Sequence, residues 1–378
     1  MNQPPRLQDL PRASALLCLE VERFCLHHLA LPRGSSLVLA LSGGADSTAL
    51  ALILSLLAPR LNLRLQGLTI NHGLRPEAGA DAAHARKTCR TLGMPCAVRE
   101  ADVQGMTTRC RMGEEEAGRA LRYALLEKER QTSGAHFIAL GHHREDLSED
   151  ILLRLVRGTG WPALGGMPAR DDKRRLLRPL LHCDPSALKD LLRHCGLDWC
   201  EDASNQSTEY RRNRLRLQVL PLLRAENPAL DRSLGNLWQL ADLDKAYWQE
   251  TLDAALRNNP WHMEETPQPE QNGLNGQRSH TALTLPRALL RSLPAAARLR
   301  LYMRAVQCLC SAASAEDEPL PDNGARQTTA AGQARAATLL ALDQALEQGR
   351  GNTLFQLPGG IEAHLKGGSI RFGRPGPV

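Results

Sequence analysis

One short run of residues, Ser42-Gly43-Gly44-Ala45-Asp46-Ser47, combines the residue types that bind phosphate. Glycine has no Cβ, so the backbone of such a loop can approach an anion closely. If a helix begins at the run, its first N–H groups donate hydrogen bonds to phosphate oxygens. A carboxylate beside phosphate is repulsive unless a cation lies between them, so Asp46 predicts a bound Mg²⁺ ion. The run is neither a Walker A motif nor a G-x-G-x-x-G fingerprint.

This phosphate loop needs a strand before it and a helix after it, and the surrounding pattern predicts both. Residues 36–41 form a continuous apolar run, which is typical of a strand buried on both faces. Along the first half of the chain, short β-rich runs alternate with helical patterns, which indicates βαβ units. The predicted strands lie at 36–41, 63–70, 96–99 and 135–140, and the predicted helices at 47–54, 80–92, 114–131 and 145–157.

The predicted fold class is α/β, with a Rossmann-like parallel sheet in the N-terminal domain, then a helical domain and a small α+β C-terminal module. We expect the first domain at 1–220, with its core at about 34–182, the second at 221–280 and the third at 281–378. The leucine spacing over 228–258 predicts one long helix in the second domain. The remaining predicted helices lie at 185–196, 286–308 and 333–348, and the predicted polar linkers at 264–281 and 312–331.

Composition and charge exclude several classes of protein. With 42% hydrophobic and 23% charged residues, the 378-residue chain can form packed cores and is not wholly disordered. No apolar run approaches the roughly 20 residues of a transmembrane helix, and no secretory signal is visible, so we expect a soluble cytoplasmic protein. The ten cysteines include no Cys-x-x-Cys pair and are expected to be reduced thiols. A net charge of +6 is compatible with a polyanionic partner.

The phosphate loop resembles the PP-loop of the N-type ATP pyrophosphatases, and later motifs resemble one family of that group, the tRNA(Ile)-lysidine synthases. Asn71-His72-Gly73-Leu74-Arg75 is similar to the family's Asn-His-x-Leu-Arg motif, and residues 115–123 to its E-x-x-x-R-x-x-R-Y pattern. Residues 142–150 resemble its His-His-x-Asp-Asp-Gln-x-Glu-Thr block, but depart from it in the first acid, the amide and the threonine. Further matches follow in the family's order at 157–167, 178–181, 201–205 and 212–216.

That resemblance implies a reaction, its cofactors and its partners. The family joins L-lysine to C2 of the wobble cytidine in tRNA(Ile) with the anticodon CAU. ATP with Mg²⁺ first adenylates the C2 oxygen and releases pyrophosphate, and the ε-amine of lysine then displaces AMP. Carried over to this chain, residues 1–220 are the PP-loop catalytic domain, 221–280 contact tRNA, and 281–378 bind substrate.

The resemblance also implies a role for each matching residue. The residues expected to bind ATP are Ser42, Gly43, Gly44, Ala45, Asp46, Ser47, His72 and Arg75. The expected catalytic residues are Asp46, Arg119, Arg122, His143, Asp146 and Glu149, and Asp46 and Asp146 are also expected to hold Mg²⁺. The residues expected to contact tRNA are Lys173, Arg174, Arg175, Arg178, Arg211, Arg212, Asn213, Arg214 and Arg216. Asp146 and Glu149 are expected to bind the lysine ammonium, and His143 to relay its proton.

Structural roles compete with these expectations. The histidines at 142–143 could pack at a strand end, and Arg119 and Arg122 could belong to a surface salt bridge. Glu149 could be surface charge, and the arginines of 211–216 could be a solvated helix face. For the whole protein, the alternatives are a PP-loop tRNA thiolase, which the missing Cys-x-x-Cys pair disfavours, and a non-catalytic tRNA-binding relative. A homodimer formed through the helix at 228–258 also stays open.

Overall fold

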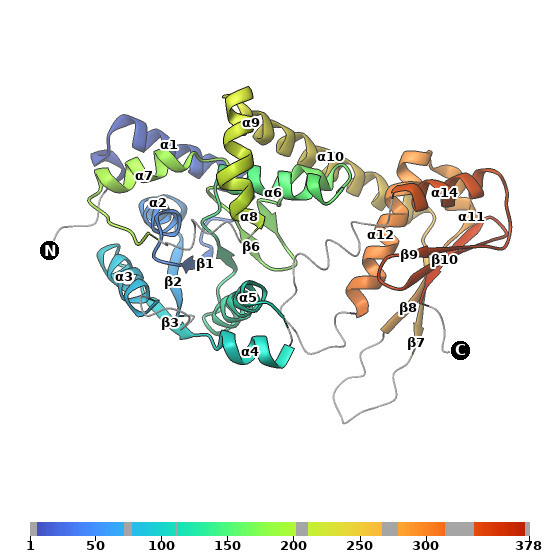
Figure 1. Ribbon diagram of the computed structural model, residues 1–378, viewed down its shortest axis with the longest axis horizontal. Helices are drawn as coiled ribbons and strands as arrows, with labels where there is room; N and C mark the ends of the chain where they lie inside the picture. Colours follow the sequence, from blue (N-terminus) through green and yellow to red (C-terminus); the bar gives the residue numbers. More distant parts are fainter. Residues whose placement is uncertain are drawn as a thin grey trace. The chain divides into compact units, whose positions relative to one another are not determined.

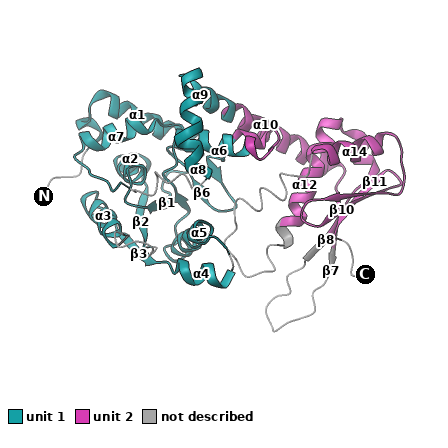
Figure 2. Cartoon of the chain, in the orientation of Figure 1, with its two compact units in different colours: residues 1–154, 166–238 teal, residues 155–165, 239–378 magenta. Residues whose placement is uncertain are grey.

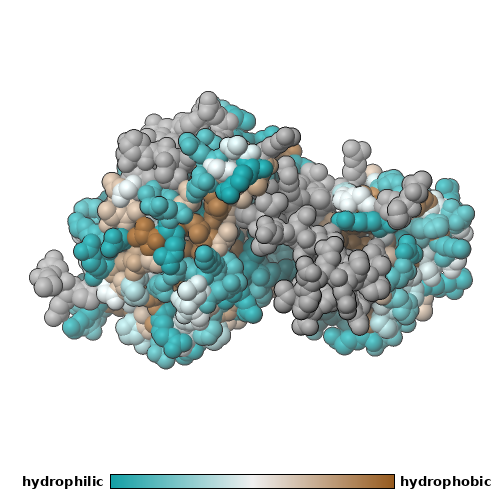
Figure 3. All heavy atoms as spheres, turned by 90° about the horizontal axis from the view of Figure 1, so that it is seen from below, coloured by the Kyte–Doolittle hydropathy of each residue, from teal (hydrophilic) through white to brown (hydrophobic). Residues whose placement is uncertain are grey.

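The computed structural model describes residues 6–71, 78–110, 112–201, 211–266, 279–313 and 336–374. The chain divides into two compact units (Figure 2), with residues 1–154 and 166–238 in unit 1 and residues 155–165 and 239–378 in unit 2. The domain boundaries expected at 220 and 280 stay predictions. Within the described part of the chain, no helix has the length and apolar character needed to cross a membrane. On the face shown in Figure 3, hydrophilic side chains surround apolar patches of unit 1.

A six-stranded sheet forms the centre of unit 1 (Figure 1), in the order β3-β2-β1-β4-β6-β5. Neighbouring strands from β3 to β6 run parallel, and β5 pairs antiparallel at one edge. The strands are β1 (Ser36–Leu41), β2 (Arg64–Asn71), β3 (Cys96–Glu100), β4 (Phe137–Ala139), β5 (Arg170–Asp171) and β6 (Leu176–Leu177). The predicted mostly parallel sheet is confirmed. Because the chain passes outward through β2 and β3 and returns on the other side of β1, the switch point lies between β1 and β4.

Alternate residues of β1 enter two different cores. Leu37 and Leu39 pack in the core that also contains α1, α2 and α7, whereas Val38 packs with Leu126 of α5 on the opposite face. Nearly every apolar residue of α2 is buried, which explains its all-round apolar sequence. The helices are α1 (Arg12–Arg23), α2 (Ala45–Leu61), α3 (Ala78–Thr91), α4 (Val103–Cys110), α5 (Glu114–Thr132), α6 (Arg144–Val156) and α7 (Pro185–His194). Short helical turns lie at Leu7–Asp9, Phe24–His28 and Ala163–Gly165.

A second helical stretch follows in the described chain from Arg211. It consists of α8 (Arg211–Arg214), a π-turn (Leu215–Val219) and α9 (Leu220–Glu226), which admits Pro221 in its first turn. The long helix predicted over 228–258 is present as α10 (Leu230–Asn258). Its first part belongs to unit 1, where buried Trp238 donates from Nε1 to the carbonyl of Met167 at 3.0 Å, and residues from 239 onward belong to unit 2.

Unit 2 contains a five-stranded antiparallel sheet in the order β7-β8-β11-β10-β9. Its core surrounds fully buried Tyr302, whose hydroxyl donates to Oδ1 of Asp343 at 2.9 Å; Arg298 donates to the same carboxylate, so the buried charge is paired. The elements are β7 (His262–Thr266), β8 (Ser279–Leu285), α11 (Arg287–Ser292), α12 (Ala295–Ala313), α14 (Ala336–Glu347), β9 (Thr353–Leu357), β10 (Ile361–Lys366) and β11 (Ser369–Gly373). The expected small α+β module is confirmed, although the helix predicted over 286–308 is two helices, and both ends of the linker predicted over 264–281 are strands.

Candidate active site

The phosphate loop lies between β1 and α2, as the sequence predicts. Gly43 has φ +84°, and a Cβ at this position would lie 3.1 Å from the carbonyl oxygen of Asp81, so glycine is required. The hydroxyl of Ser47 donates to the carbonyl of Gly44 at 3.0 Å and accepts the N–H of Ser42 at 3.2 Å. The loop is therefore preorganised at the N-terminus of a 17-residue helix, where anions bind favourably.

The segment after β4 closes against the phosphate loop. A Cβ on Gly141 would lie 2.9 Å from the carbonyl oxygen of Asp46 and 3.1 Å from the nitrogen of Ser47, so only glycine permits this approach. The approach brings His143 and the start of α6 to the carboxyl end of β1. The loop and α6 therefore meet at the switch point, where open α/β sheets bind ligands.

His143 lies between two carboxylates. Its Nε2 atom is 3.4 Å from Oδ2 of Asp46 and 3.6 Å from Oδ2 of Asp146. Its Nδ1 atom accepts the N–H of Glu145 at 3.2 Å, so the neutral ring carries its proton on Nε2, facing the carboxylates. Burial lowers the pKa of His143, but the hydrogen bond to Asp46 and the charge of Asp146 outweigh burial, so the net shift of its pKa is upward.

Two arginines bind the acidic face of α6. Arg212 donates from Nη2 to Oδ1 of Asp146 at 2.7 Å and from Nε to Oε2 of Glu149 at 2.5 Å. Arg216 donates from Nε to the other oxygen of Glu149, which has no exposed surface. We name Arg212 and Arg216 the arginine clamp. Glu149 was expected to bind the lysine ammonium, but both of its oxygens accept from the clamp. The clamp arginines were expected to contact tRNA phosphates, but their guanidiniums face α6.

His142, the residue before His143, is held by the buried side chain of Arg178. Arg178 is 5% exposed and donates from Nε to Nδ1 of His142 at 3.1 Å and from Nη1 to the carbonyl of Pro168 at 2.7 Å. Burial and the charge of Arg178 lower the pKa of His142 to about 3, so its ring is neutral at physiological pH. The guanidinium of Arg178 lies in the interior of unit 1, away from the surface where tRNA contacts were expected.

Of the two predicted catalytic arginines of α5, Arg119 lies beside the ring of Tyr123. The guanidinium carbon of Arg119 is 5.2 Å from the centroid of the Tyr123 ring, and that of Arg174 is 6.0 Å from it. Arg119 and Arg122 are both exposed. The action of these two arginines on ATP stays a prediction.

The other residues expected to bind tRNA are divided between two places. Lys173 and Arg175 are exposed in the turn between β5 and β6, while Arg211 and Arg214 are exposed on α8 and Asn213 is half-buried. Their contact with tRNA stays a prediction. His72 and Arg75, expected to bind ATP, lie outside the described residues.

The two residues expected to hold Mg²⁺ differ in availability. In the described chain, no group of three or more His, Cys, Asp or Glu side chains could hold a metal ion. Asp46 has a side chain 43% exposed beside the phosphate loop, which suits the single carboxylate that often joins substrate phosphates around Mg²⁺. In Asp146, Oδ1 accepts from Arg212, and Oδ2 accepts the N–H of His143 at 3.0 Å. Asp46 therefore fits the ion, and Asp146 would first have to give up a partner.

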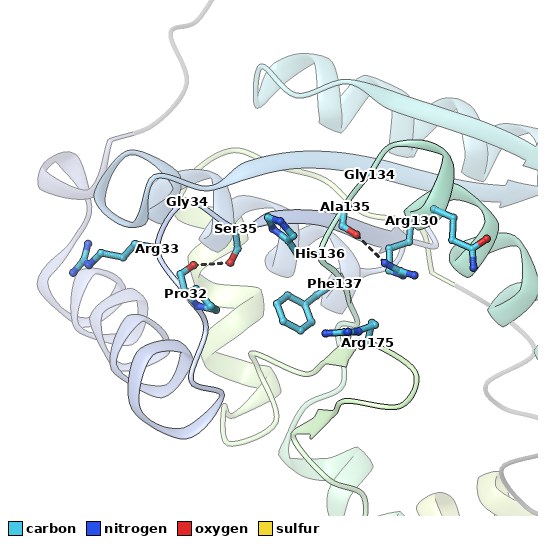
Figure 4. A pocket seen from close by; sticks show the side chains of 11 residues that line it. Pro32, Arg33, Gly34, Ser35, Arg130, Gly134, Ala135, His136, Phe137 and Arg175 are labelled. Atoms are coloured by element: carbon cyan, nitrogen blue, oxygen red, sulfur yellow. Dashed lines mark hydrogen bonds between the residues drawn. The ribbon is translucent and has the colours of Figure 1, made fainter. Parts of the chain in front are cut away.

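A cavity of about 650 Å³ lies at the amino ends of β1 and β4, opposite the ends that carry the phosphate loop (Figure 4). Arg33, Arg130, His136 and Arg175 line it, and Arg130 donates from Nη1 to the carbonyl of Ala135 at 3.0 Å. Ligands of open α/β sheets bind outside the carboxyl ends of the strands. This cavity is therefore separate from the site at the phosphate loop.

Sequence reasoning missed several residues that support the site. The backbone N–H of Cys200 donates to the carbonyl of Gly43 at 2.9 Å and so fixes the phosphate loop from outside. Arg224 and Asp231 bind α6 through Glu145 and Ser148. The sequence carried one signal for the contact with Arg224: residue 145 is glutamate where the family's acidic block has aspartate. A longer acidic side chain can reach a more distant partner.

Comparison with known proteins shows the family to which the chain belongs. The chain matches the PP-loop domain family over residues 19–223, more than half of its length. It is similar to the tRNA(Ile)-lysidine synthase of Nitratidesulfovibrio vulgaris, with 43% identity over 343 residues that cover 90% of this chain and 92% of the relative. The same protein of Thermobifida fusca is 32% identical over 344 residues, with the same two coverages. Among solved structures, the U34-tRNA thiolase NcsA of Methanococcus maripaludis has a TM-score of 0.49 and 16% identity, over 60% of this chain and 78% of that one.

The fold and site define a PP-loop protein, a class of ATP-using enzymes. Within that class, the chain belongs to the tRNA(Ile)-lysidine synthase family.

Proposed function

We propose that this chain joins L-lysine to C2 of the wobble cytidine of tRNA(Ile) with the anticodon CAU, using ATP and releasing AMP and pyrophosphate through an adenylated cytidine. One observation carries the proposal: a PP-loop and an acidic helix face meet at the switch point, in a chain 43% identical to a tRNA(Ile)-lysidine synthase over nearly its whole length. The thiolase is the weaker alternative because it does not account for that identity, and the intact PP-loop argues against the non-catalytic relative.

In this proposal the PP-loop holds the pyrophosphate of ATP. The N–H groups at the start of α2, with the hydroxyl of Ser42, donate to its oxygens. The hydroxyl of Ser47 would first have to give up its hydrogen bond to the carbonyl of Gly44. Asp46 would hold Mg²⁺, which offsets negative charge on the phosphates when it is bound. Arg119 and Arg122 are proposed to add positive charge at the α-phosphate, and His72 and Arg75 to contact ATP.

Asp146 is proposed to bind the ammonium of the lysine side chain in place of one of its present partners, Arg212 or the N–H of His143. Of the two predicted acids it is the one beside the PP-loop, since His143 lies within 3.6 Å of both Asp46 and Asp146. Only the neutral amine can attack C2 of the adenylated cytidine, so the ammonium must lose a proton. Nε2 of neutral His143 already carries a proton, so it does not take the lysine proton itself; it donates to the carboxylates that it faces, and Asp146 is left to accept that proton.

The tRNA is proposed to lie along exposed basic residues of unit 1. Lys173 and Arg175 in the β5–β6 turn and Arg211 and Arg214 on α8 are suited to phosphate contacts, which dominate nucleic-acid affinity. The target cytidine must leave its stack to reach the site, as bases that undergo chemistry generally do. A cytoplasmic location and a homodimer through α10 remain predictions.

The proposal is tested with purified protein, ATP, Mg²⁺, labelled lysine and an unmodified tRNA(Ile) transcript. We expect label to appear in acid-precipitable RNA, and none with a tRNA(Met) transcript, whose anticodon is also CAU. Release of pyrophosphate without incorporation of lysine would contradict the proposed nucleophile. Binding of tRNA without any release of pyrophosphate would favour the non-catalytic alternative.

A further inference from the structure

A second layer of polar contacts lies beside the acidic face of α6. The hydroxyl of wholly buried Ser148 donates to Oδ1 of Asp231, at the start of α10, at 2.7 Å. Arg224 of α9 donates from Nε to Oδ2 of Asp231 at 2.8 Å and from Nη2 to Oε1 of Glu145 at 3.0 Å. We name Glu145, Ser148, Arg224 and Asp231 the α6 latch.

The α6 latch and the arginine clamp bind different strips of the same helix. Residues three apart share a strip, so Asp146 and Glu149 form the strip that the clamp binds. Glu145 and Ser148 form the neighbouring strip, which lies one residue, or about 100°, around the helix. Because contacts from two directions hold α6, its rotation about its own axis is fixed.

The latch also reaches the histidine of the site. The N–H of Glu145 donates to Nδ1 of His143, whose Nε2 lies 3.4 Å from Oδ2 of Asp46. A rotation of α6 that displaced Glu145 would therefore move His143 and Asp146 together relative to the PP-loop.

Residue 145, at which this chain departs from the family's acidic block, takes part in the latch. The family pattern has aspartate there, and this chain has glutamate, whose Oε1 accepts from Arg224 at 3.0 Å. Removing one methylene would withdraw the carboxylate by about 1.5 Å, the length of one C–C bond, and break the hydrogen bond. The longer acid therefore belongs with this particular arginine.

We infer that Arg224 and Asp231 are positioning residues for the reaction. They do not touch the reacting atoms, but they fix the rotation of α6 and hence the place of Asp146 beside the PP-loop. This inference rests on the proposed function. Small displacements of reacting groups cost large factors in rate, and a misplacement of about 1 Å can cost about 10²-fold.

The first variant is Asp231→Asn, which keeps the shape of the side chain and removes the charge that pairs with Arg224. We expect the KM for lysine to rise and kcat/KM for lysine to fall about tenfold or more, because Asp146 is displaced. The KM for ATP should change less than the KM for lysine, because the backbone of the PP-loop is held by its own hydroxyls and by Cys200. A purely structural role would reduce the amount of folded enzyme and lower every rate equally, without changing any KM.

Ser148→Ala is a second variant, which deletes one hydrogen bond and keeps a good helix former in α6. The double variant Ser148→Ala/Asp231→Asn should lose less than the sum of the single losses, since both residues act through one contact. Asp190→Asn, which changes an exposed carboxylate of α7, is the matched control. An unchanged kcat/KM for lysine in both single variants, with a parent protein that incorporates lysine, would overturn the inference. A parent protein that incorporates no lysine would contradict the proposed function and remove the inference with it.

Discussion

The Nε2 atom of His143 lies 3.4 Å from Oδ2 of Asp46, the carboxylate of the PP-loop. Asp46 follows β1 and His143 follows β4, so this contact crosses the switch point of the sheet. Since Nδ1 of the same ring accepts the N–H of Glu145, the ring presents its Nε2 proton to Asp46. His143 therefore orients the Asp46 carboxylate at the place where the phosphates of ATP are proposed to bind.

Asp46→Ala tests this carboxylate. We expect release of pyrophosphate from ATP to fall by at least about 10²–10³-fold, the effect of losing one electrostatic group at a reacting centre. Affinity for tRNA, measured by filter binding, should stay close to that of the parent, because Asp46 lies in the PP-loop and not on the basic surface. Asp46→Asn keeps the size and removes the charge, so it should be as inactive as Asp46→Ala. Full activity in either variant would contradict the proposed role of Asp46.

Glu149→Gln tests the arginine clamp. The substitution leaves two guanidiniums without their shared carboxylate, and removing one partner of a buried ion pair typically costs about 3–5 kcal/mol. Because Arg212 and Arg216 are each 31% exposed, we expect the lower part of that range in the free energy of unfolding, measured with urea.

Asp190→Asn is the matched control for Glu149→Gln. It breaks the pair with Arg193, in which both side chains are more than half exposed. The free energy of unfolding should therefore fall by less than about 1 kcal/mol. Equal losses of stability in Glu149→Gln and Asp190→Asn would show that the clamp is not a buried pair.

Arg211→Gln combined with Arg214→Gln tests the proposed tRNA surface. Each phosphate contact that is lost lowers the slope of log affinity against log salt by roughly 0.7–0.9, so the double variant should reduce the slope by roughly 1–2. Fluorescence anisotropy with labelled tRNA over a series of salt concentrations measures it. Arg193→Gln, on the exposed face of α7, should leave the slope unchanged. A slope identical to that of the parent in the double variant would remove α8 from the tRNA surface.

His182 predicts a dependence of stability on pH. Its ring lies 4.3 Å from that of Phe24, between centroids, and burial lowers its pKa from 6.5 to about 4. Between these two values the unfolded chain binds a proton that the folded chain does not, so stability is full above pH 6.5 and is lost as the pH falls towards 4. We expect the melting temperature of the parent to fall as the pH is lowered from 6.5 to 4. The melting temperature of His182→Gln should fall less over the same range. Parallel curves for the two proteins would contradict the assignment.

Local patterns predicted the first half of the fold well. The run at 36–41 has the same bounds as β1, because residues 37–41 are all apolar, as is typical of a strand buried on both faces. The prediction of a single helix over 286–308 was wrong, because Pro294 separates α11 from α12. Strands β7 and β8 were missed because their pairing brings together residues on either side of a polar stretch, which no local pattern reports.

The sequence predicted the loops of the site but not its ion pairs. The PP-loop and the histidine pair carry compact motifs, so sequence placed them directly. The clamp joins Arg212 and Glu149 across 63 residues, and a basic run looks the same whether its arginines face solvent or a buried acid. The π-turn at Leu215–Val219, which inserts a residue into the helix between Arg212 and Arg224, has no sequence signature either.

The most direct test of the central claim is mass spectrometry of the wobble nucleoside. A tRNA(Ile) transcript with the anticodon CAU is incubated with the protein, ATP, Mg²⁺ and lysine, then digested to nucleosides. We predict that the wobble cytidine is replaced by its lysine adduct at C2, with one AMP released for each adduct. Recovery of unmodified cytidine, or of a nucleoside carrying sulfur in place of the C2 oxygen when a sulfur donor is supplied, would contradict the account.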